Sequence, residues 1–286
     1  MINLKNKRIL VLGFARSGYS TVKILKKLGY DVKLNSYDDL SNDEKAQELR
    51  ELGIKIIDGG HPLELLETVD LIVKNPGIKY QIEFLQKAVE MGIDIITEIE
   101  LANTLFSIDM VAITGTNGKT TTTQMTYDIL KKANKDVFLA GNIGFPSIEV
   151  AYNHPKSLII TEVSSFQLEG TKYFKPSIAV ITNLGEGHLD YHGNLENYQN
   201  AKKKIYVNQT KDDFLIINIK EKEKYNIDLR KLALTQIKKL GIKDENMSVM
   251  EYCTYSSKDE KGNLKFHSHR RDRTLSMNMA LFLGKA

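Results

Sequence analysis

The sequence is poor in cysteine and has no long apolar run, and each absence excludes a class of protein. Cys253 is the single cysteine among 286 residues, which excludes an internal disulfide and favours a reducing compartment. No apolar stretch approaches the roughly 20 residues that a membrane-spanning helix needs. The first residues, MINLKNKRILVLG, lack the apolar core of a signal peptide. We therefore expect a cytoplasmic protein that does not insert into a membrane.

A strong excess of either charge is also missing. The chain has 40 Lys and Arg residues against 36 Asp and Glu residues, a formal net charge of +4. The lysines are scattered over polar faces, so nucleic acid is not an expected partner. With 42% hydrophobic and 27% charged residues, the composition is that of a globular protein, and the length suits one large or two ordinary domains.

Strand-like and helix-like segments alternate over the first hundred residues. The strands are expected at 7–13, 31–38, 54–60, 71–78 and 93–100, and the helices at 17–29 and 82–92. Such alternation predicts a parallel sheet with helices on both faces. We therefore expect an α/β protein whose residues 1–102 form a Rossmann-like domain.

A second alternating series follows and predicts most of a nucleotide-binding parallel sheet. Its strands are expected at 110–115, 136–142, 157–165, 177–185 and 213–218, and its helices at 119–133 and 198–209. The pattern stops after Asn218, where IKEKEKYNIDLRK is densely charged. We place a boundary near residues 219–226, so that residues 103–221 form most of a nucleotide-binding domain of P-loop type and residues 222–286 an α+β tail.

The stretch ITGTNGKTTTT, residues 113–123, joins a strand to a helix. Glycines let the backbone wrap a phosphate, and the helix N-terminus favours its charge. Lys119 is expected to reach the β and γ phosphates, and the Thr120 hydroxyl to bind Mg²⁺. Ile113 breaks the common GxxxxGK[ST] spacing, which leaves a simple glycine-rich turn as the alternative. The predicted phosphate-binding residues are Gly115, Thr116, Asn117, Gly118, Lys119, Thr120 and Thr121.

A second glycine-containing turn, GFARSG at 13–18, also follows a strand and opens a helix. It lacks the full GxGxxG spacing, which argues against NAD. A helix N-terminus there is able to hold a diphosphate, and a tight turn without a ligand is the alternative.

Polar side chains also follow two other strands of the second series. Glu162 ends one strand, and His188 and Asp190 lie in the loop after another. Ligands bind at the carboxyl ends of parallel strands, and a carboxylate there suits Mg²⁺. A solvated strand end and a surface histidine are the alternatives. Lys202, between other lysines, otherwise suggests a solvated helix face.

Taken together, these segments resemble the Mur ligase family, the ATP-dependent amide-forming enzymes of peptidoglycan synthesis. EVSSFQLE (162–169) resembles the branch of the family that adds D-glutamate to UDP-N-acetylmuramoyl-L-alanine. The other matching segments, in the family's order, are GFARSG (13–18), KNPGI (74–78), ITGTNGKTTTT (113–123), GNIG (141–144), TNLGEGHLDYHG (182–193) and YQNAKKKI (198–205). The resemblance covers residues 1 to about 218 and implies ATP and Mg²⁺ as cofactors and a monomer.

The resemblance also implies roles for individual residues. Lys119 and Thr120 would bind the ATP phosphates and Mg²⁺, Glu162 one Mg²⁺ and His188 a second. Lys202 would be carbamylated, which turns a cation into an anionic metal ligand. The residues that would face the muramoyl-alanine part are Asn142, Ser164, Ser165 and Gln167. The residues that would contact the UDP part are Phe14, Ala15, Arg16, Ser17, Asn35, Ser36, Asn75 and Gly77. Asn35 replaces a common acidic residue of the family, and Asn75 a frequent serine.

The tail, from about residue 222, resembles the C-terminal end of the YfiH-type laccase-domain family. CTY (253–255) and HSHRRDRT (267–274) carry that resemblance, although the family's upstream His/Cys metal cluster has no counterpart here. Cys253, His267 and His269 are therefore an incomplete metal-binding set.

The family's complete ligases need a longer central domain and a third domain, so we expect ATP and substrate binding with little or no turnover. Two alternatives remain open from the residues. One is a nucleotide-binding fusion protein without catalysis. The other is a purine nucleoside phosphorylase or oxidase of the YfiH type, which the missing metal cluster disfavours.

Overall fold

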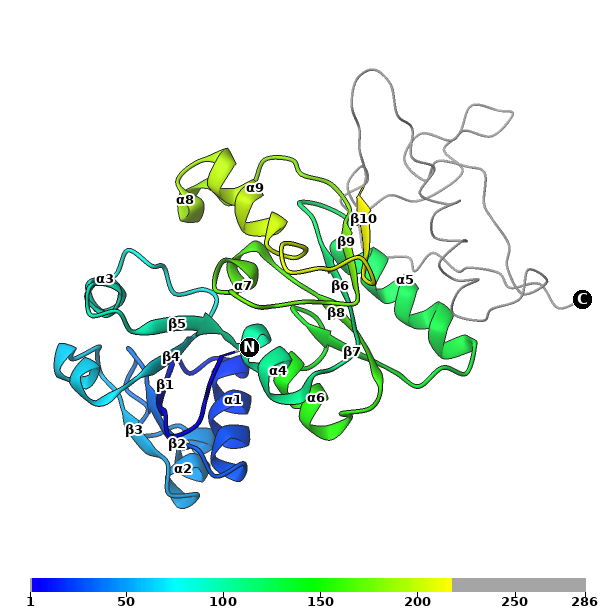
Figure 1. Cartoon of the computed structure of the whole chain (residues 1–286). Helices are drawn as coiled ribbons and strands as arrows, with labels where there is room; N and C mark the ends of the chain where they lie inside the picture. Colours follow the sequence, from blue (N-terminus) through cyan, green and yellow to red (C-terminus); the bar gives the residue numbers. More distant parts are fainter. Residues whose placement is uncertain (1, 218–286) are drawn as a thin grey trace, which may run out of the picture. The chain divides into compact units, whose positions relative to one another are not determined.

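The computed structural model describes residues 2–217, and the structural statements below concern those residues. They form two parallel sheets of five strands each, coloured from blue to cyan and from green to yellow in Figure 1. The α/β class predicted from the alternating pattern is confirmed. Within this part of the chain, no helix is both long and apolar enough to cross a bilayer.

The first sheet has the strand order β3-β2-β1-β4-β5, with every neighbouring pair parallel. Its strands are β1 (Arg8–Leu12), β2 (Asp31–Asn35), β3 (Lys55–Ile57), β4 (Leu71–Lys74) and β5 (Asp94–Thr97). The helices between them are α1 (Arg16–Lys27), α2 (Glu44–Glu51), the 3₁₀ helix η1 (Leu63–Thr68) and α3 (Glu83–Glu90). This is the sheet that the first alternating series predicts.

The central strand β1 shows why its run is apolar throughout. Ile9 and Val11 belong to one buried cluster, and Leu10 and Leu12 belong to another. Successive side chains of a strand point to opposite faces, so both faces of β1 are covered.

The second sheet has the order β10-β9-β6-β8-β7 and is also parallel. Its strands are β6 (Met110–Thr114), β7 (Val137–Gly141), β8 (Leu158–Glu162), β9 (Ile178–Ile181) and β10 (Phe214–Ile217). Its helices are α5 (Lys119–Lys132), α6 (Ser147–Asn153), α7 (Ser165–Glu169), α8 (Leu189–His192) and α9 (Leu195–Lys203). β6 lies at the centre, so the phosphate loop that follows it has neighbouring strand ends on both sides.

The expected strands end earlier in the structure than the apolar pattern indicated, and a helix closely follows two of them. The strand expected over 93–100 ends at Thr97, where helix α4 (Glu98–Phe106) begins. The one expected over 157–165 ends at Glu162, and α7 begins at Ser165 with a capping box between Ser164 and Gln167. Both helices turn the chain at the carboxyl end of a strand. The expected domain boundary at residue 102 falls inside α4, and the division into domains stays a prediction.

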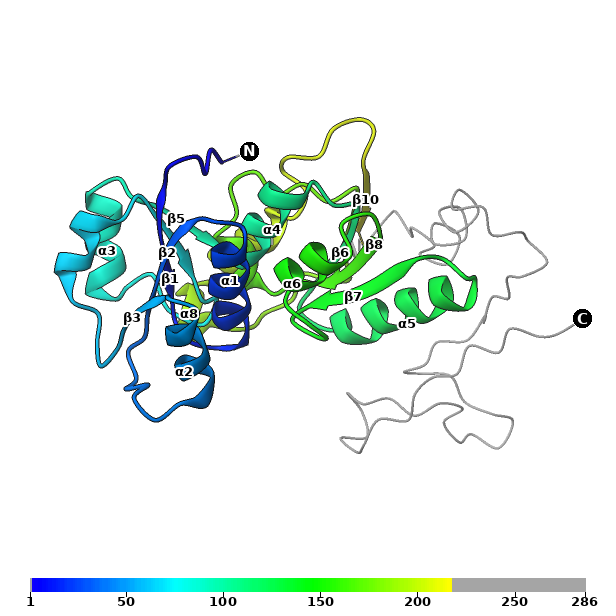
Figure 2. The same cartoon turned by 90° about the horizontal axis from the view of Figure 1, so that it is seen from below.

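Helices α4 and α6 lie between the two sheets in both views (Figures 1 and 2). The carboxylate of Glu98, at the start of α4, accepts a hydrogen bond from the backbone N–H of Ile148 at the start of α6. Ser20 Oγ of α1 donates to Glu149 Oε2 of α6 at 2.6 Å. Glu98 is buried, and burial raises its pKa to about 7 even though the Ile148 N–H and Arg16 favour the charged form.

We expect Glu98→Gln to be more stable than the natural chain above pH 7 and about equally stable near pH 5. The pKa of Glu98 rises on folding from the ordinary 4.5. The raised pKa means that the folded chain favours protonated Glu98. The stabilisation that Glu98 gives is therefore complete below pH 4.5 and is lost as the pH rises through 7. The full shift corresponds to about 3 kcal/mol at most. Thermal unfolding of both chains from pH 5 to 8.5 measures this, and a Tm difference independent of pH would contradict it.

Candidate functional site

The loop after β6 has the backbone of an anion-binding turn. It begins at Gly115, with φ +153°, and ends at Gly118, with φ +78°, directly before α5. A Cβ at Gly115 would lie 1.9 Å from Thr182 Oγ1, so only glycine fits there. No side chain of the described residues caps the N-terminus of α5. The first N–H groups of that helix are therefore available to an anion.

Two lysines from different elements converge on this loop. Lys119 Nζ donates to the carbonyl oxygens of Gly115 at 2.9 Å and Thr116 at 3.2 Å. Lys202 Nζ, from α9, donates to the same Gly115 oxygen at 2.9 Å. Lys202 is only 1% exposed, so the interpretation of this residue as part of a solvated helix face is wrong. Burial, and secondly the charge of Lys119, lowers the pKa of Lys202 to about 7, and burial also lowers the pKa of Lys119.

Asn183 holds the phosphate loop in shape, although it was not among the residues predicted from the sequence. Its Oδ1 accepts from the backbone N–H groups of Thr116 at 3.1 Å and Asn117 at 3.0 Å, and its Nδ2 donates to the Asn117 oxygen at 2.9 Å. Thr182 Oγ1 donates to the same oxygen at 2.6 Å. Both side chains directly follow β9, which pairs with β6. Glu162 was predicted as a site residue because it is a polar residue at the end of a strand. The same criterion would have predicted Thr182 and Asn183.

Within the part of the chain that the structure describes, one carboxylate oxygen of Glu162 has no hydrogen-bond partner. Glu162 ends β8 opposite Ile113 of β6, one strand away from the phosphate loop. Its Oε1 accepts from Asn142 Nδ2 at 2.7 Å, whereas Oε2 is buried and has no hydrogen-bond partner among residues 2–217. A buried unpartnered carboxylate oxygen is costly unless a cation or donor completes it. Such an oxygen suits Mg²⁺, which prefers oxygen ligands, and a contribution from the Thr120 hydroxyl stays a prediction.

His188 lies at the start of α8, with a left-handed φ of +52°. Its exposed side chain packs edge-on against Phe166, with ring centroids 4.9 Å apart. No three His, Cys, Asp or Glu side chains gather as a metal-binding group anywhere in residues 2–217. A metal site here would therefore depend on Glu162 with hydroxyl and modified-lysine ligands, and the second Mg²⁺ at His188 stays a prediction.

The residues expected to face the muramoyl-alanine part lie along the same edge of the second sheet. Asn142, after β7, is joined to Glu162 through its amide. Ser164 and Gln167 bond to each other in the capping box of α7. Ser165 is buried and its Oγ lies 3.0 Å from His192 Nε2. Burial lowers the pKa of His192 to about 4, so this imidazole is neutral near pH 7.

The residues expected to contact the UDP part gather at the carboxyl edge of the first sheet. Asn75 Nδ2 donates to Ser17 Oγ at 3.3 Å, and Asn75 Oδ1 accepts from the Gly77 N–H at 3.0 Å. The start of α1 offers a second set of these residues. Ala15 and Arg16 are exposed there, and no side chain of the described residues caps the helix. The half-buried Phe14 packs against Tyr19 of α1. The loops after β1 and β4 therefore meet beside a helix start that suits a diphosphate.

Asn35 and Ser36 are placed differently. Asn35 is fully buried, and its Nδ2 donates to the carbonyl oxygens of Ile57 and Gly60, each at 2.8 Å. Its Oδ1 therefore acts as the acceptor for His61 Nδ1, 2.6 Å away. The backbone N–H of Ser36 donates to the Ile57 oxygen at 2.9 Å. Asn35 therefore holds the chain after β3 in place through its side chain. Contacts of Asn35 and Ser36 with the uridine part stay predictions.

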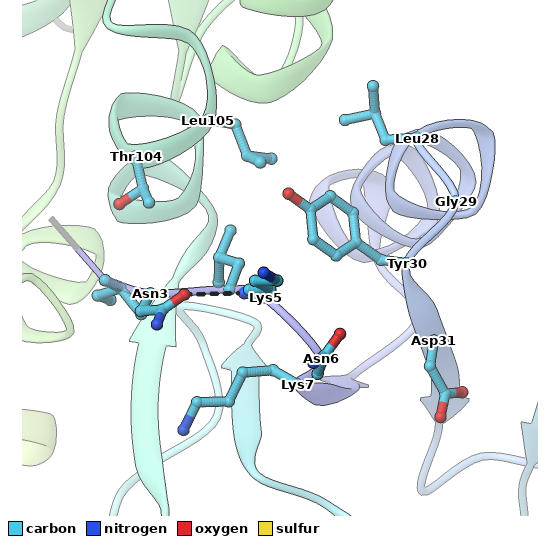
Figure 3. Close-up of a pocket in the computed structure, with 12 residues that line it drawn as sticks. Asn3, Lys5, Asn6, Lys7, Leu28, Gly29, Tyr30, Asp31, Thr104 and Leu105 are labelled. Carbon is cyan, nitrogen blue, oxygen red and sulfur yellow. Dashed lines mark hydrogen bonds between the residues drawn. The ribbon is translucent and has the colours of Figure 1, made fainter.

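A cavity of about 650 Å³ lies away from these groups (Figure 3). Its wall includes Lys5, Lys7, Tyr30 and Asp31, at the amino ends of β1 and β2 and the carboxyl end of α1. Ligands of open parallel sheets bind at the opposite, carboxyl ends of the strands. The candidate site is therefore the edge that carries the phosphate loop, Glu162 and Lys202.

The part of the sequence that contains the phosphate loop, Glu162 and Lys202 is similar to a known protein family. Residues 113–285, more than half of the chain, match the sequence profile of the Mur ligase middle domain. The chain belongs to the Mur ligase family. Residues 7–97 of this Mur ligase chain match the N-terminal domain of MurD-like Mur ligases, so the first sheet is of the MurD type.

Two curated relatives of this Mur ligase chain carry the name UDP-N-acetylmuramoylalanine–D-glutamate ligase. The protein from Staphylococcus haemolyticus is 51% identical over 216 residues, which is 75% of this chain and 48% of the relative. The protein from Staphylococcus aureus strain JH9 is 48% identical over 221 residues, which is 77% of this chain and 49% of the relative. The chain therefore spans about half the length of the curated relatives it matches.

A solved structure shares the fold of this Mur ligase chain. It is the UDP-N-acetylmuramate:L-alanyl-gamma-D-glutamyl-meso-diaminopimelate ligase of Neisseria meningitides, with a TM-score of 0.50 and 19% identity over 81% of this chain and 75% of that chain. The middle-domain match continues beyond Asn218 into the segment for which the YfiH-type resemblance was noted. That resemblance, with Cys253, His267 and His269, lies outside the described residues and stays a prediction.

Proposed function

We propose that this chain binds ATP with Mg²⁺ at the phosphate loop and UDP-N-acetylmuramoyl-L-alanine at the adjoining strand ends, in a ligase that adds D-glutamate. The observation that carries the proposal is the convergence of Lys119, Lys202 and the free oxygen of Glu162 around one loop. The names of the two staphylococcal relatives support the choice of substrates. A cytoplasmic monomer that does not bind nucleic acid is part of the same proposal.

ATP would take over hydrogen bonds that the loop now makes to itself. Lys119 Nζ bonds to two loop carbonyls, and in the complex with ATP it would bond to the β and γ phosphates instead. The N–H groups at the start of α5 would hold the phosphate oxygens. Asn183 would keep the loop in shape from behind, because it bonds the backbone of Thr116 and Asn117 on the side of β9.

The residues present suit Mg²⁺. Glu162 Oε2 and the Thr120 hydroxyl would hold the ion, and a carbamylated Lys202 would add a second anionic ligand. Mg²⁺, when bound, would neutralise the clustered phosphate oxygens. Glu162 itself is held by Asn142, so that its free oxygen is kept at the strand end.

The proposed reaction has two steps that these residues would serve by positioning and charge. An oxygen of the alanyl carboxylate bonds to the γ-phosphorus of ATP while the bond to the β-phosphate oxygen breaks, giving an acyl phosphate and ADP. The amine of D-glutamate then attacks the acyl carbon, loses a proton and displaces phosphate. Lys119 would stabilise the charge that develops on the transferred phosphoryl group.

Lys202 is expected to take up carbon dioxide. Only a neutral amine adds to CO₂, and a pKa of about 7 leaves much of this lysine neutral at pH 8. Incubation with ¹³C-bicarbonate is therefore expected to give a carbamate signal in the ¹³C NMR spectrum of the natural chain. Lys202→Ala is expected to lose that signal. A carbamate signal of equal intensity in both proteins would contradict the assignment.

Calorimetry and phosphate release together test the proposed function. Titration with ATP–Mg²⁺ and with UDP-N-acetylmuramoyl-L-alanine is expected to show one site for each on the folded chain. An absence of heat with both ligands would overturn the proposal. D-glutamate-dependent phosphate release measures turnover, which the sequence predicts to be low or absent. Binding of both ligands without any release would favour the alternative of a nucleotide-binding protein without catalysis.

A further inference from the structure

The buried lysine at the end of β4 is not used by the proposed reaction. Lys74 is 1% exposed, and no carboxylate oxygen of residues 2–217 lies within 4 Å of its Nζ. Burial lowers the pKa of Lys74 to about 8, although Glu169 favours its charged form. A buried cation without a directly paired carboxylate is costly. The cost of burying this ammonium must therefore be offset by other contacts, and its hydrogen bonds show which groups it holds.

The hydrogen bonds of Lys74 fall on the loop that is expected to receive the UDP substrate. Its Nζ donates to the carbonyl oxygens of Asn75 at 3.3 Å, Pro76 at 3.1 Å and Ile78 at 2.7 Å. Three carbonyls of one short loop thus converge on a single ammonium. The loop also touches the turn after β1, because Asn75 bonds to Ser17. A change at Lys74 would therefore reach both loops of the UDP site.

The same ammonium connects this loop to the second sheet. Lys74 Nζ donates to Tyr191 Oη of α8 at 3.1 Å. Tyr191 Oη lies 3.2 Å from the Pro76 oxygen and 3.1 Å from the Ile78 oxygen, so its single proton is shared between these two carbonyls. The ring of Tyr191 packs on Phe166, with centroids 4.5 Å apart. His188 is the residue directly before α8. The contacts of Tyr191 therefore connect loop 75–78 to the helix that follows His188.

We propose that Lys74 and Tyr191 are positioning residues. The Lys74 ammonium holds loop 75–78 in the shape that receives the UDP substrate, and Tyr191 holds that loop at a fixed place relative to α8. This inference rests on the proposed function, and it adds two residues that touch neither ATP nor the reacting carboxylate. The Lys74 ammonium is also a buried positive charge in contact with loop 75–78, where water screens little.

The charge of Lys74 makes substrate affinity depend on pH. A bound dianion stabilises the protonated ammonium, so affinity is expected to fall as the pH rises from 7 to 9 through the pKa of Lys74. The other titratable groups around it are Glu169 of α7, Tyr191 and His192 of α8, Tyr80 beside the loop and Lys204 near Glu169. Burial raises the pKa of both tyrosines and of Glu169. A variant that removes Lys74 alone separates its contribution from theirs.

The test compares Lys74→Met and Tyr191→Phe with the natural chain, using calorimetry with each ligand in turn. Lys74→Met is expected to weaken UDP-N-acetylmuramoyl-L-alanine binding at least tenfold at pH 7 and to remove the fall in affinity toward pH 9. ATP–Mg²⁺ affinity is expected to stay within twofold. Tyr191→Phe keeps the ring on Phe166 and is expected to weaken substrate binding about threefold. Lys87→Met, an exposed lysine of α3, is the matched control.

The outcomes separate this inference from the proposed function. Natural-chain binding of both ligands with unchanged substrate affinity in Lys74→Met would overturn the inference and leave the proposed function standing. Equal losses for both ligands, or an unaltered pH profile, would also overturn it, because they indicate a general structural role. Should Lys74→Met not fold, Tyr191→Phe decides, and natural-chain affinity in that variant is the contrary result. Absence of substrate binding by the natural chain would overturn both.

Discussion

Lys119→Ala is expected to weaken ATP–Mg²⁺ binding by about 100-fold or more and to leave the binding of UDP-N-acetylmuramoyl-L-alanine within twofold. The lysine is the first residue of α5 and lies against the phosphate loop. Its loss removes at least two charge-assisted hydrogen bonds to phosphate, each contributing about 1.5–3 kcal/mol. Calorimetry with each ligand at pH 7.5 measures the two affinities separately.

Stability distinguishes this loss of binding from a loss of structure. Burial lowers the pKa of Lys119, so folding disfavours its charge, and alanine is expected to keep or raise the Tm. Lys132→Ala, an exposed lysine in the last turn of the same helix, is the matched control and should bind ATP normally. Full ATP affinity in a folded Lys119→Ala chain would show that the loop is a simple glycine-rich turn.

Glu162→Gln is expected to remove the dependence of ATP affinity on Mg²⁺. The amide keeps the size of the side chain and its contact with Asn142, but it takes away the charge and the free carboxylate oxygen. Loss of groups around a bound metal lowers affinity by about 10- to 100-fold, and a direct ligand belongs at the upper end. ATP titrations with and without Mg²⁺ measure the difference between the two affinities.

The pKa of Lys202 provides a second measurement on Glu162→Gln. The Glu162 charge raises the pKa of Lys202 against the effects of burial and Lys119, so the variant is expected to lower that pKa further. Glu90→Gln, on the exposed face of α3, changes the same charge far from the loop and should alter neither quantity. An undiminished Mg²⁺ effect in Glu162→Gln would exclude Glu162 as a metal ligand.

The strands and the phosphate loop could be predicted from short stretches of the sequence. The apolar runs around Val11 and Ile113 predicted strands of parallel sheets, because strands covered on both faces need apolar residues at every position. Helices α6, α7 and α8 were not predicted, since helices of four to seven residues carry too little periodicity. The Ser164–Gln167 capping box, visible in the sequence, was the one signal for α7.

The sequence by itself determined the α/β class, the glycines that tight turns require and the set of polar residues at strand ends. It did not decide which of those residues face a ligand. Lys202 and Lys203 are neighbours of the same type, yet the packing of α9 buries Lys202 against Gly115. Lys74 was unremarkable as a strand end until the loop carbonyls and Tyr191 surrounded it. Such roles depend on contacts between residues as many as 117 positions apart, and only the tertiary structure brings them together.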